Sequence, residues 1–242
     1  MDPKDIILKD INYDNLVREY GEFVYIVSHD LNAPLRHLKE FSHLLVNSLE
    51  NTINDDQKTY VSFINQSLSR LDSMQHALLE FSRINTLQKS KKTINSNYCI
   101  ARTIRQMAKD IDIRSVNIYY KSLPDIYGDP LLISKLFYCL IKNATQYHFN
   151  DGQKTIYIRS KQDEKQIIFE IEDNGIGIDS QFCEAVFTMF RRLHNQDEYG
   201  GGTGAGLAIA KKIVEIHNGH IWIESKATMG TKVLVSFPKE SI

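Results

Sequence analysis

The feature that most constrains this chain is one long amphipathic helix that places His29 opposite its apolar seam. Apolar side chains recur every three or four residues across residues 16–49, which is the spacing of a helix that buries one stripe. His29 lies two residues from both Val27 and Leu31, so at about 100° per residue it points about 200° away from each. We therefore expect the His29 imidazole to face solvent beside the carboxylate of Asp30.

Pro34 follows Asp30 by about one helical turn and weakens the helix there. Proline has no backbone N–H, so the Asp30 carbonyl loses its helical donor and the turn carrying His29 can bend. An exposed imidazole beside a carboxylate suits a nucleophile better than a core residue. No role is assigned to six other histidines: His37, His43, His76, His148, His217 and His220.

A second amphipathic helix follows, and the two predict an antiparallel hairpin. Asn54 is placed to cap this helix, and Asp55 and Asp56 in its first turn favour the helix dipole. Its apolar stripe covers residues 61–81. Two long helices with narrow stripes cannot bury both stripes fully against each other. We expect a second copy of the chain to complete a dimeric four-helix bundle.

Composition restricts the partners and the compartment. The 242 residues are 42% hydrophobic and 24% charged, which suits one large or two ordinary globular domains. A net charge of −1 gives no field that would attract nucleic acid. Cys99, Cys139 and Cys183 are far apart and are interpreted as reduced core residues. Without a signal peptide or an apolar run of about 18 residues, we expect a cytoplasmic chain, with any membrane-bound or light-sensing input module outside it.

The pattern of elements changes after an irregular, lysine-rich segment at residues 85–93. We expect a helical domain at 1–88, a linker at 89–93 and a second domain at 94–242. In the second domain, helices are expected at 98–111, 130–147, 181–190 and 203–217. Strands are expected at 116–121, 154–160, 165–173, 220–225 and 231–237. This order predicts an α/β sandwich, a mixed sheet with helices on one face.

Glycine placement indicates a ligand site in the second domain. Seven of the 12 glycines form two clusters: Gly175 and Gly177, then Gly200, Gly201, Gly202, Gly204 and Gly206. The first cluster follows a strand and puts Asp173 at the strand end. The second is expected to enter a helix at about Thr203, where free N–H groups favour phosphate. Either cluster taken alone is also compatible with an ordinary loop.

Five stretches of the chain, in order, resemble the motifs of sensor histidine kinases. SHDLNAPLR resembles the H-box, LFYCLIKNATQY the N-box, DNGIG the G1 box, VFTMFRRLH the F-box and GTGAGLAIAKKIVEIHNGHIWIES the G2 box. The sequence RLHNQDEYGG is similar to the corresponding segment of phytochrome-type bacterial kinases. The resemblance covers residues 16–238, and its ATP-binding part is shared with the GHKL-type ATPases such as gyrase, the heat-shock chaperones and MutL.

This resemblance implies a protein-histidine kinase of a bacterial two-component signal transduction system. His29 would take a phosphoryl group from Mg-ATP and pass it to an aspartate of a response-regulator receiver domain. Asp30 would hold the N–H of the ring nitrogen proximal to the backbone, and Arg192 would meet the terminal phosphate. Asn143 would bind Mg²⁺ through its amide oxygen, and Asp173 would accept from the adenine amino group.

The same resemblance assigns further nucleotide contacts, with the glycines giving close backbone approach and a flexible lid. These contacts are Tyr147, Gly175, Gly177, Ile178, Phe187, Gly202, Thr203, Gly204, Gly206 and Leu207. Three of them, Tyr147, Ile178 and Leu207, are equally compatible with a plain core role.

The chain departs from the family pattern at three positions. Cys139 stands where the family often has a second asparagine. Gln146 replaces a common lysine and keeps a hydrogen-bond donor without the charge, which predicts lower ATP affinity. Ala33 replaces the Thr or Asn that usually lies four residues after the phosphoacceptor. It predicts weak phosphatase activity toward the receiver.

Two other functions stay open at this point. Cys139 and Gln146 are compatible with a phosphotransfer or dimerisation scaffold that has a weakened ATP site. The glycine clusters alone are compatible with a gyrase- or chaperone-like ATPase that never phosphorylates itself. The H-box argues against the second alternative, and intact Asn143 and Asp173 argue against the first.

Overall fold

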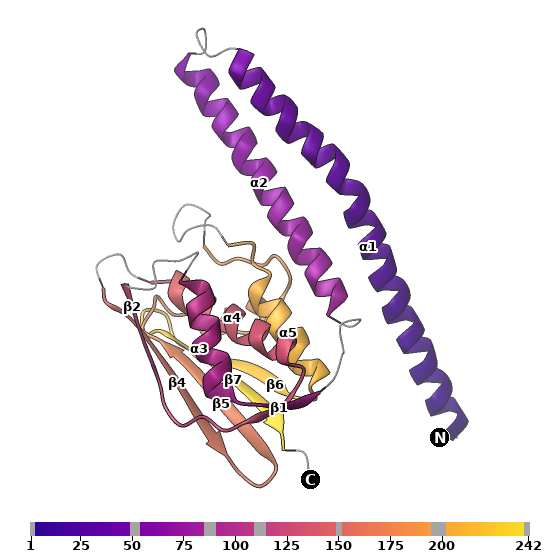
Figure 1. Ribbon diagram of the computed structural model, residues 1–242, viewed down its shortest axis with the longest axis vertical. Helices are drawn as coiled ribbons and strands as arrows, with labels where there is room; N and C mark the ends of the chain where they lie inside the picture. Colours follow the sequence, from indigo (N-terminus) through magenta and orange to yellow (C-terminus); the bar gives the residue numbers. More distant parts are fainter. Residues whose placement is uncertain are drawn as a thin grey trace. The chain divides into compact units, whose positions relative to one another are not determined.

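The computed structural model describes residues 3–48, 54–84, 91–108, 115–148, 152–194 and 202–239, with the backbone alone at 3–20, 22 and 23. The chain divides into two compact units, Met1–Thr86 and Leu87–Ile242, drawn in Figure 1 as a helical hairpin and an α/β unit. Most of the expected 89–93 linker lies outside the described residues. Its last two residues belong to strand β1 (Lys92–Ile94).

The first unit is the predicted antiparallel hairpin of α1 (Pro3–Ser48) and α2 (Asp55–Arg83) (Figure 1). Asn54 caps α2 as expected: its side chain accepts from the Gln57 N–H at 2.8 Å, and the Gln57 side chain accepts from the Asn54 N–H at 2.9 Å. Asp55 and Asp56 lie in the first turn. The helix α1 continues through Pro34 without ending there.

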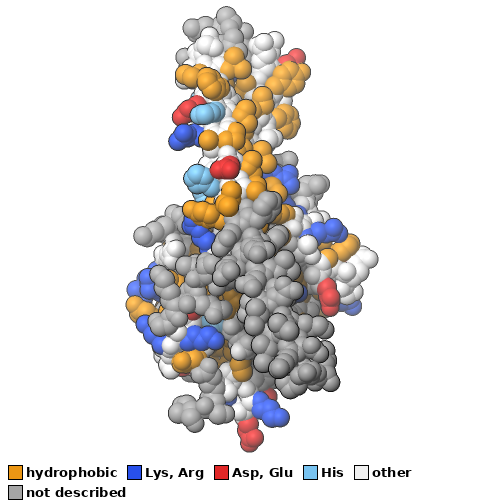
Figure 2. Space-filling model, turned by 90° about the vertical axis from the view of Figure 1, so that its right-hand side faces the viewer, with side chains coloured by type: hydrophobic (Ala, Val, Ile, Leu, Met, Phe, Trp, Pro, Cys, Tyr) orange, Lys and Arg blue, Asp and Glu red, His pale blue; other side chains and the backbone are white. Residues whose placement is uncertain are grey.

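The hairpin leaves much of its apolar seam uncovered within the described residues. Leu31, Leu38 and Leu45 on α1 are 47%, 56% and 54% exposed, and Ile64 and Leu71 on α2 are 48% and 49% exposed. Figure 2 shows hydrophobic side chains gathered along this hairpin. One hairpin therefore buries only part of the surface that its sequence pattern sets aside for a core.

The second unit is built on a five-stranded mixed sheet in the order β2-β4-β5-β7-β6, with β2 and β4 parallel and the other pairs antiparallel. Its strands are β2 (Val116–Tyr120), β4 (Lys154–Gln162), β5 (Gln166–Asp173), β6 (His220–Ser225) and β7 (Thr231–Pro238). Three helices cover one face of the sheet (Figure 1): α3 (Ser96–Met107), α4 (Pro130–Gln146) and α5 (Gly206–Ile216). The fold class is therefore as predicted.

The core lies between the helices and the sheet. Along β4, Ile156 and Ile158 are buried while Tyr157 is exposed, which is the alternation of a strand with one covered face. Phe137 of α4 meets Phe169 of β5 edge to face, with ring centroids 5.6 Å apart. The start of α4 is fixed by Asp129, whose Oδ1 accepts from the N–H groups of the second and third residues after it.

Several element predictions are wrong. The expected helix 181–190 is two 3-10 turns, η2 (Ser180–Phe182) and η3 (Ala185–Phe187), because the backbone is extended at Thr188 and left-handed at Phe190. The helix expected from Thr203 begins at Gly206, since Gly204 has a φ of 73°, which no α-helix accommodates.

Smaller differences concern the edges of the second unit. The helix α3 begins at Ser96, two residues earlier than predicted, because Asn95 accepts from the Tyr98 N–H at 2.9 Å. The predicted elements omit β1 and β3 (Ile126–Gly128), which pair with each other as a separate antiparallel ribbon. None of the helices in the described residues combines the length and the apolar character that a membrane span requires.

The three cysteines are thiols that form no disulfide, and two of the three lie where we expected them. Cys99 and Cys139 are buried on α3 and α4. Cys183 is only half-buried at the end of η2, so its interpretation as a core residue is wrong. The physical reason is that a short 3-10 turn at the surface has no continuous buried face.

Candidate functional site

His29 projects from the exposed side of α1. Its side chain is 71% exposed and that of Asp30 is 75% exposed, and His29 Nδ1 lies 3.3 Å from Asp30 Oδ1. When Nδ1–H donates to this carboxylate, the proton of the neutral ring is on Nδ1 and the lone pair is on Nε2. The geometry therefore presents a nucleophilic nitrogen distal to the backbone.

Tyr25 lies beside the histidine and Arg83 lies over the Tyr25 ring, and neither residue was predicted to belong to the site. The Tyr25 ring centroid is 6.5 Å from that of His29, and the Arg83 guanidinium lies 5.4 Å from the Tyr25 centroid. Tyr25 is four residues before His29, so the helical i, i+4 spacing was an available signal. Arg83 comes from the far end of α2, and no local spacing predicts it. The Tyr25 ring thus lies near both the Arg83 guanidinium, which is positively charged, and the His29 imidazole.

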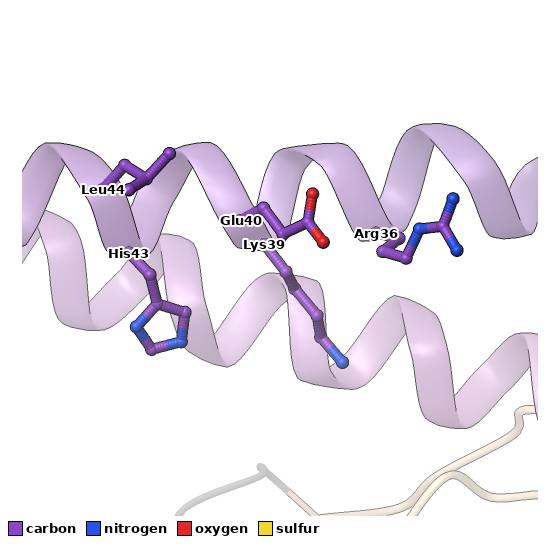
Figure 3. Close-up of a pocket in the computed structure, with 5 residues that line it drawn as sticks. All are labelled: Arg36, Lys39, Glu40, His43 and Leu44. Carbon is purple, nitrogen blue, oxygen red and sulfur yellow. The ribbon is translucent and has the colours of Figure 1, made fainter.

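A hollow lies farther along α1 from His29. Figure 3 shows the side chains that line it: Arg36, Lys39, Glu40, His43 and Leu44. Lys39 extends from α1 toward α2, where its Nζ lies 2.8 Å from Asp72 Oδ2. The hollow begins seven residues after His29, which is about two turns of the helix.

Asp173 occupies the end of β5 in the second unit. Its residue is 9% exposed, and its Oδ1 accepts from the Gly175 N–H at 2.8 Å and from the Thr231 N–H at 3.2 Å. Burial raises the pKa of the carboxyl to about 6, against the lowering effect of these two hydrogen bonds. Thr231 was not predicted, because it lies 58 residues along the chain and only the β5–β7 pairing brings it here.

The first glycine turn packs on the C-terminal end of α4. A Cβ atom on Gly175 would lie 2.1 Å from the Tyr147 carbonyl oxygen, so only glycine fits this position. That same oxygen accepts from the Ile176 N–H at 3.1 Å. Tyr147 is the C-terminal cap of α4, and half-buried Asn143 lies on α4 one turn earlier. Asn143, Tyr147, Asp173 and Gly175 are therefore brought to one region.

The second glycine turn packs against the segment that follows η3. The carbonyl of Gly204 accepts from the Phe190 N–H at 3.0 Å, and a Cβ on Gly204 would lie 3.1 Å from Arg192 Cγ. Thr203 Oγ1 accepts from the Ala205 N–H at 3.3 Å, and α5 begins at the next residue. Gly200 and Gly201 lie outside the described residues. The structure thus brings Arg192 to the glycine turn at the start of α5.

Tyr147 lies near Arg192 and His194 as well as the first glycine turn. Burial raises the pKa of its hydroxyl, and the nearby Arg192 charge opposes that rise. The Tyr147 and His194 ring centroids are 6.2 Å apart, which adds His194 to the region; it is the last residue of the F-box stretch VFTMFRRLH, but no role was predicted for it. The Gln146 side chain lies against Gly202, 3.1 Å from the position of an added Cβ. The residue that replaces the family lysine therefore contacts the second glycine turn.

The remaining predicted contacts lie around these turns. Gly177 has a φ of 71° and packs against the Lys226 carbonyl, and the Ile178 N–H donates to Ser225 Oγ at 2.8 Å. Phe187 closes η3, with Lys211 Nζ 5.8 Å from its ring centroid. Gly206 is the first residue of α5 and Leu207 is buried behind it.

We predict that Gly204→Ala destabilises the second unit while Gly206→Ala does not. Alanine at position 204 would keep a φ of 73° with its Cβ 2.8 Å from the Arg191 carbonyl oxygen. We expect a loss of about 1–3 kcal/mol in the free energy of unfolding. Gly206 has no atom within 4 Å of an added Cβ, so it is a matched control. Denaturant unfolding without nucleotide measures both variants, and equal stabilities would contradict the strain at Gly204.

The comparisons with known proteins divide the chain as the fold does. Residues 19–87 match the His Kinase A (phospho-acceptor) domain. Residues 128–241 match the Histidine kinase-, DNA gyrase B-, and HSP90-like ATPase family. Cyanobacterial phytochrome B of Nostoc sp. (strain PCC 7120) is 36% identical over 211 residues, covering 86% of this chain and 28% of that protein. The chain spans 28–30% of the length of the cyanobacterial phytochromes that it matches.

Solved structures share the fold at lower sequence identity. Full-length ShkA in complex with AMPPNP has a TM-score of 0.63 and 18% identity, covering 91% of this chain and 47% of that one. The histidine kinase ThkA in complex with the response regulator protein TrrA has a TM-score of 0.59 and 18% identity, covering 96% of this chain and 66% of that one. Both of these structures therefore contain a hairpin followed along the chain by an α/β unit of this fold.

Proposed function

Since the chain belongs to the histidine kinases, with a phospho-acceptor domain followed by an ATPase domain, we propose that it phosphorylates His29 from ATP and passes the phosphoryl group to a response-regulator aspartate. The observation that carries this proposal is the exposed His29 ring, whose Nδ1 lies 3.3 Å from Asp30 Oδ1. This contact favours the tautomer in which Nε2 is the nucleophile. The helical unit would be the dimerisation and phosphotransfer domain, 1–88, and the α/β unit the catalytic domain, 94–242.

His29 acts by in-line displacement. Its Nε2 forms a bond to the γ-phosphorus while the bond from that phosphorus to the β,γ-bridging oxygen breaks, and ADP leaves. Asp30 holds the Nδ1 proton and stabilises the positive charge that develops on the ring. Transfer to the receiver reverses the first step at the histidine, because the N–P bond breaks as an aspartate oxygen attacks. The ring then returns to its neutral tautomer.

The region around Asp173 fits an adenine nucleotide. A buried carboxylate held by two backbone N–H groups is an oriented acceptor for an exocyclic amine, and guanine presents a carbonyl there instead. The close turn at Gly175 lets the backbone approach a flat ring. The bound nucleotide supplies the phosphoryl group, and Asn143 would hold the Mg²⁺ on its phosphates through the amide oxygen.

The second glycine turn suits the phosphates. Backbone N–H groups at the start of α5 favour an anion, and Arg192 beside Gly204 would balance charge on the transferring group. Gly202, Thr203 and Gly206 complete this turn. Four further side chains or turns would line the nucleotide site: Tyr147, Gly177, Ile178 and Leu207. Phe187 would pack beneath the turn, and Gln146 would donate to it without adding charge.

Two partners follow from the hairpin. Its exposed seam residues would be covered by a second copy, which gives a homodimeric four-helix bundle. The hollow lined by Arg36, Lys39, Glu40, His43 and Leu44 lies about two turns from His29 and offers charges of both signs for a receiver domain. The ATP supply and a receiver partner would place this activity in the cytoplasm. We expect no nucleic-acid partner, because a net charge of −1 gives no attracting field.

Incubation with γ-labelled Mg-ATP, followed by a panel of receiver domains, tests this function. We expect acid-labile, base-stable phosphate on the chain and its transfer to one or more receivers. A phosphotransfer scaffold with a weakened ATP site would fail to bind nucleotide in calorimetry. A gyrase- or chaperone-like ATPase would release inorganic phosphate while the chain stays unlabelled. Either outcome would replace the proposal.

We predict strong kinase activity with little receiver phosphatase activity, because of Ala33. This exposed residue follows His29 by one turn on the same face of α1. Its methyl group cannot orient the water that attacks a phosphoaspartate, whereas a Thr or Asn there adds a hydrogen bond worth about 1 kcal/mol. The decay of a purified phosphorylated receiver measures the activity. We expect at least about a fivefold gain for Ala33→Thr or Ala33→Asn.

The control for this prediction is the unmodified chain with the same receiver. If it accelerates the decay strongly, another group already orients the water and Ala33 has no such consequence.

A further inference from the structure

Gln75 is a buried amide on the face of α2 that packs against α1. It is 6% exposed and lies seven residues after Leu68, so both occupy the same heptad position of the helix. Its Nε2 donates to the main-chain carbonyl oxygen of Ser28. Ser28 is 0% exposed and directly precedes His29. A side chain of α2 therefore holds the α1 backbone at the residue before the phosphoacceptor.

A second bond of the same kind lies two turns away. Ser82 Oγ donates to the Gly21 carbonyl oxygen at 2.8 Å. Ser82 is seven residues after Gln75 on α2, and Gly21 is seven residues before Ser28 on α1. Both acceptors are small residues, which lets a side chain of α2 reach the α1 main chain. The two bonds together fix the rotation and the axial register of α1 over the two turns that lead to His29.

Stability alone does not account for Gln75. Gln75 Oε1 and Ser28 Oγ are both buried and have no hydrogen-bond partner within the described part of the chain. Buried polar atoms without partners destabilise a fold. An apolar residue here would continue the seam that Leu68 occupies one heptad earlier. The amide thus weakens the hairpin core while it makes one specific bond to the backbone.

The bond from Gln75 to the Ser28 carbonyl lies on the N-terminal side of His29, away from the turn of α1 that Pro34 weakens. Pro34 has no N–H, so the helical bond to the Asp30 carbonyl is missing in the turn after His29. The turn before His29 is therefore the one that can set the direction of the ring. The contact with Asp30 orients the imidazole about the side-chain torsions of His29. The direction of the His29 Cα–Cβ bond follows instead from the rotation of α1 about its axis.

We propose that Gln75 is a positioning residue for phosphoryl transfer, since its bond to Ser28 sets the rotation of α1 at His29. This inference rests on the proposed function, because it concerns how well Nε2 meets the γ-phosphorus. A small misplacement of a reacting atom is enough to slow a reaction strongly. Loss of the amide should then lower the rate of transfer without altering the nucleotide site, which belongs to the other unit.

The test compares Gln75→Met with Gln66→Met in the full chain. Methionine matches the length of glutamine and lacks the donor, and Gln66 is an exposed glutamine of the same helix. For Gln75→Met we expect kcat of autophosphorylation to fall about tenfold or more, with an unchanged KM for ATP. The midpoint of thermal unfolding should stay equal or rise. Gln66→Met should stay within about twofold in rate.

Two outcomes would overturn the inference. One is full kcat in Gln75→Met, and the other is a fall in kcat that is matched by a fall in thermal stability, which is what a structural role alone predicts. Amide hydrogen exchange at residues 29–33 gives a readout that needs no kinase activity. We expect faster exchange in Gln75→Met than in the unmodified chain, and unchanged exchange would count against the role.

Phosphate labelling of the unmodified chain distinguishes a failure of the proposed kinase function from a failure of the positioning role of Gln75. If that chain takes no phosphate from Mg-ATP, the proposed function fails. If it is labelled normally and Gln75→Met equals it in kcat, only the positioning role fails. Ser82→Ala should change kcat in the same direction as Gln75→Met, by a smaller factor, because its bond lies two turns farther from His29.

Discussion

Replacing His29 by glutamine is expected to remove autophosphorylation, by more than about 1,000-fold, while the affinity for ATP stays within about twofold. The ring is 71% exposed and its neighbour Asp30, 3.3 Å away, is 75% exposed, so the hairpin should not respond to the loss of the ring. Nucleotide affinity should persist because the residues that fit ATP belong to the other unit. Phosphate labelling and calorimetry on one preparation measure both quantities.

His76 provides a matched control for this prediction. Its side chain is 72% exposed on α2, and its Nδ1 lies 2.9 Å from the Asp72 carbonyl oxygen. When Nδ1–H donates to that oxygen, the lone pair is on Nε2, as in His29. We expect His76→Gln to be labelled like the unmodified chain. Residual labelling of His29→Gln would show that a second histidine takes the phosphate and would contradict the assignment of the phosphoacceptor.

The second large effect is expected for Asp173→Asn, which should lower the affinity for ATP about 100-fold. The amide replaces a charged acceptor for the adenine amine and turns a donor toward it. The asparagine oxygen can still accept from the Gly175 and Thr231 N–H groups, so the turn should keep its shape. Calorimetric titration with Mg-ATP measures the change, and an affinity equal to that of the unmodified chain would contradict the adenine assignment.

The same substitution should stabilise the second unit. The pKa of Asp173 is raised from its ordinary 3.8 to about 6, so the ionised carboxylate opposes folding. The stability of the unmodified chain therefore falls as pH rises from 4 through 6, and at pH 7 the cost is roughly 1–3 kcal/mol. We expect Asp173→Asn to unfold at higher denaturant concentration at pH 7 and to lose this advantage near pH 4.

Equal denaturation midpoints at pH 7 would show that the burial of Asp173 carries no such penalty. A lower midpoint for the variant would show that the carboxylate charge holds the turn together. Neither result would alter the ATP titration, so the two measurements test different properties of one residue.

The hairpin was predictable because its signals are local. A seam spaced at three and four residues fixes a helix, and Asn54 followed by two aspartates fixes where the next one starts. The exposure of His29 was predicted from its angle to Val27 and Leu31. His29 is exposed, but Val27 and Leu31 are themselves 38% and 47% exposed in this hairpin, and the residues buried in this turn are Val24 and Ser28. The exposure of the leucines along α1 was likewise implied by two stripes too narrow to bury each other.

The second unit was predictable in its elements and less so in its boundaries. The start of α5 was placed at Thr203 because a glycine-rich turn was assumed to enter the helix directly. A left-handed Gly204 delays it by three residues. The ribbon of β1 and β3 was missed because strands of three residues have too few positions to show alternation.

Contacts between distant segments were beyond sequence reasoning. Thr231 reaches Asp173 only through the register of β5 and β7, and Arg83 reaches Tyr25 only through the hairpin. Gln75 could be recognised as a polar residue at an apolar heptad position. Its acceptor could not be predicted, because the Ser28 carbonyl is a backbone group and the pattern of side chains does not indicate which backbone group a distant side chain reaches.

The position of the phosphate after incubation with Mg-ATP shows whether His29 is the phosphoacceptor. Mass spectrometry with a fragmentation method that preserves phosphohistidine locates the residue, and phosphorus NMR distinguishes the two ring nitrogens. We expect one phosphate on Nε2 of His29, lost in acid and retained in base. Phosphate on another residue, or ATP turnover that leaves the chain unphosphorylated, would contradict it.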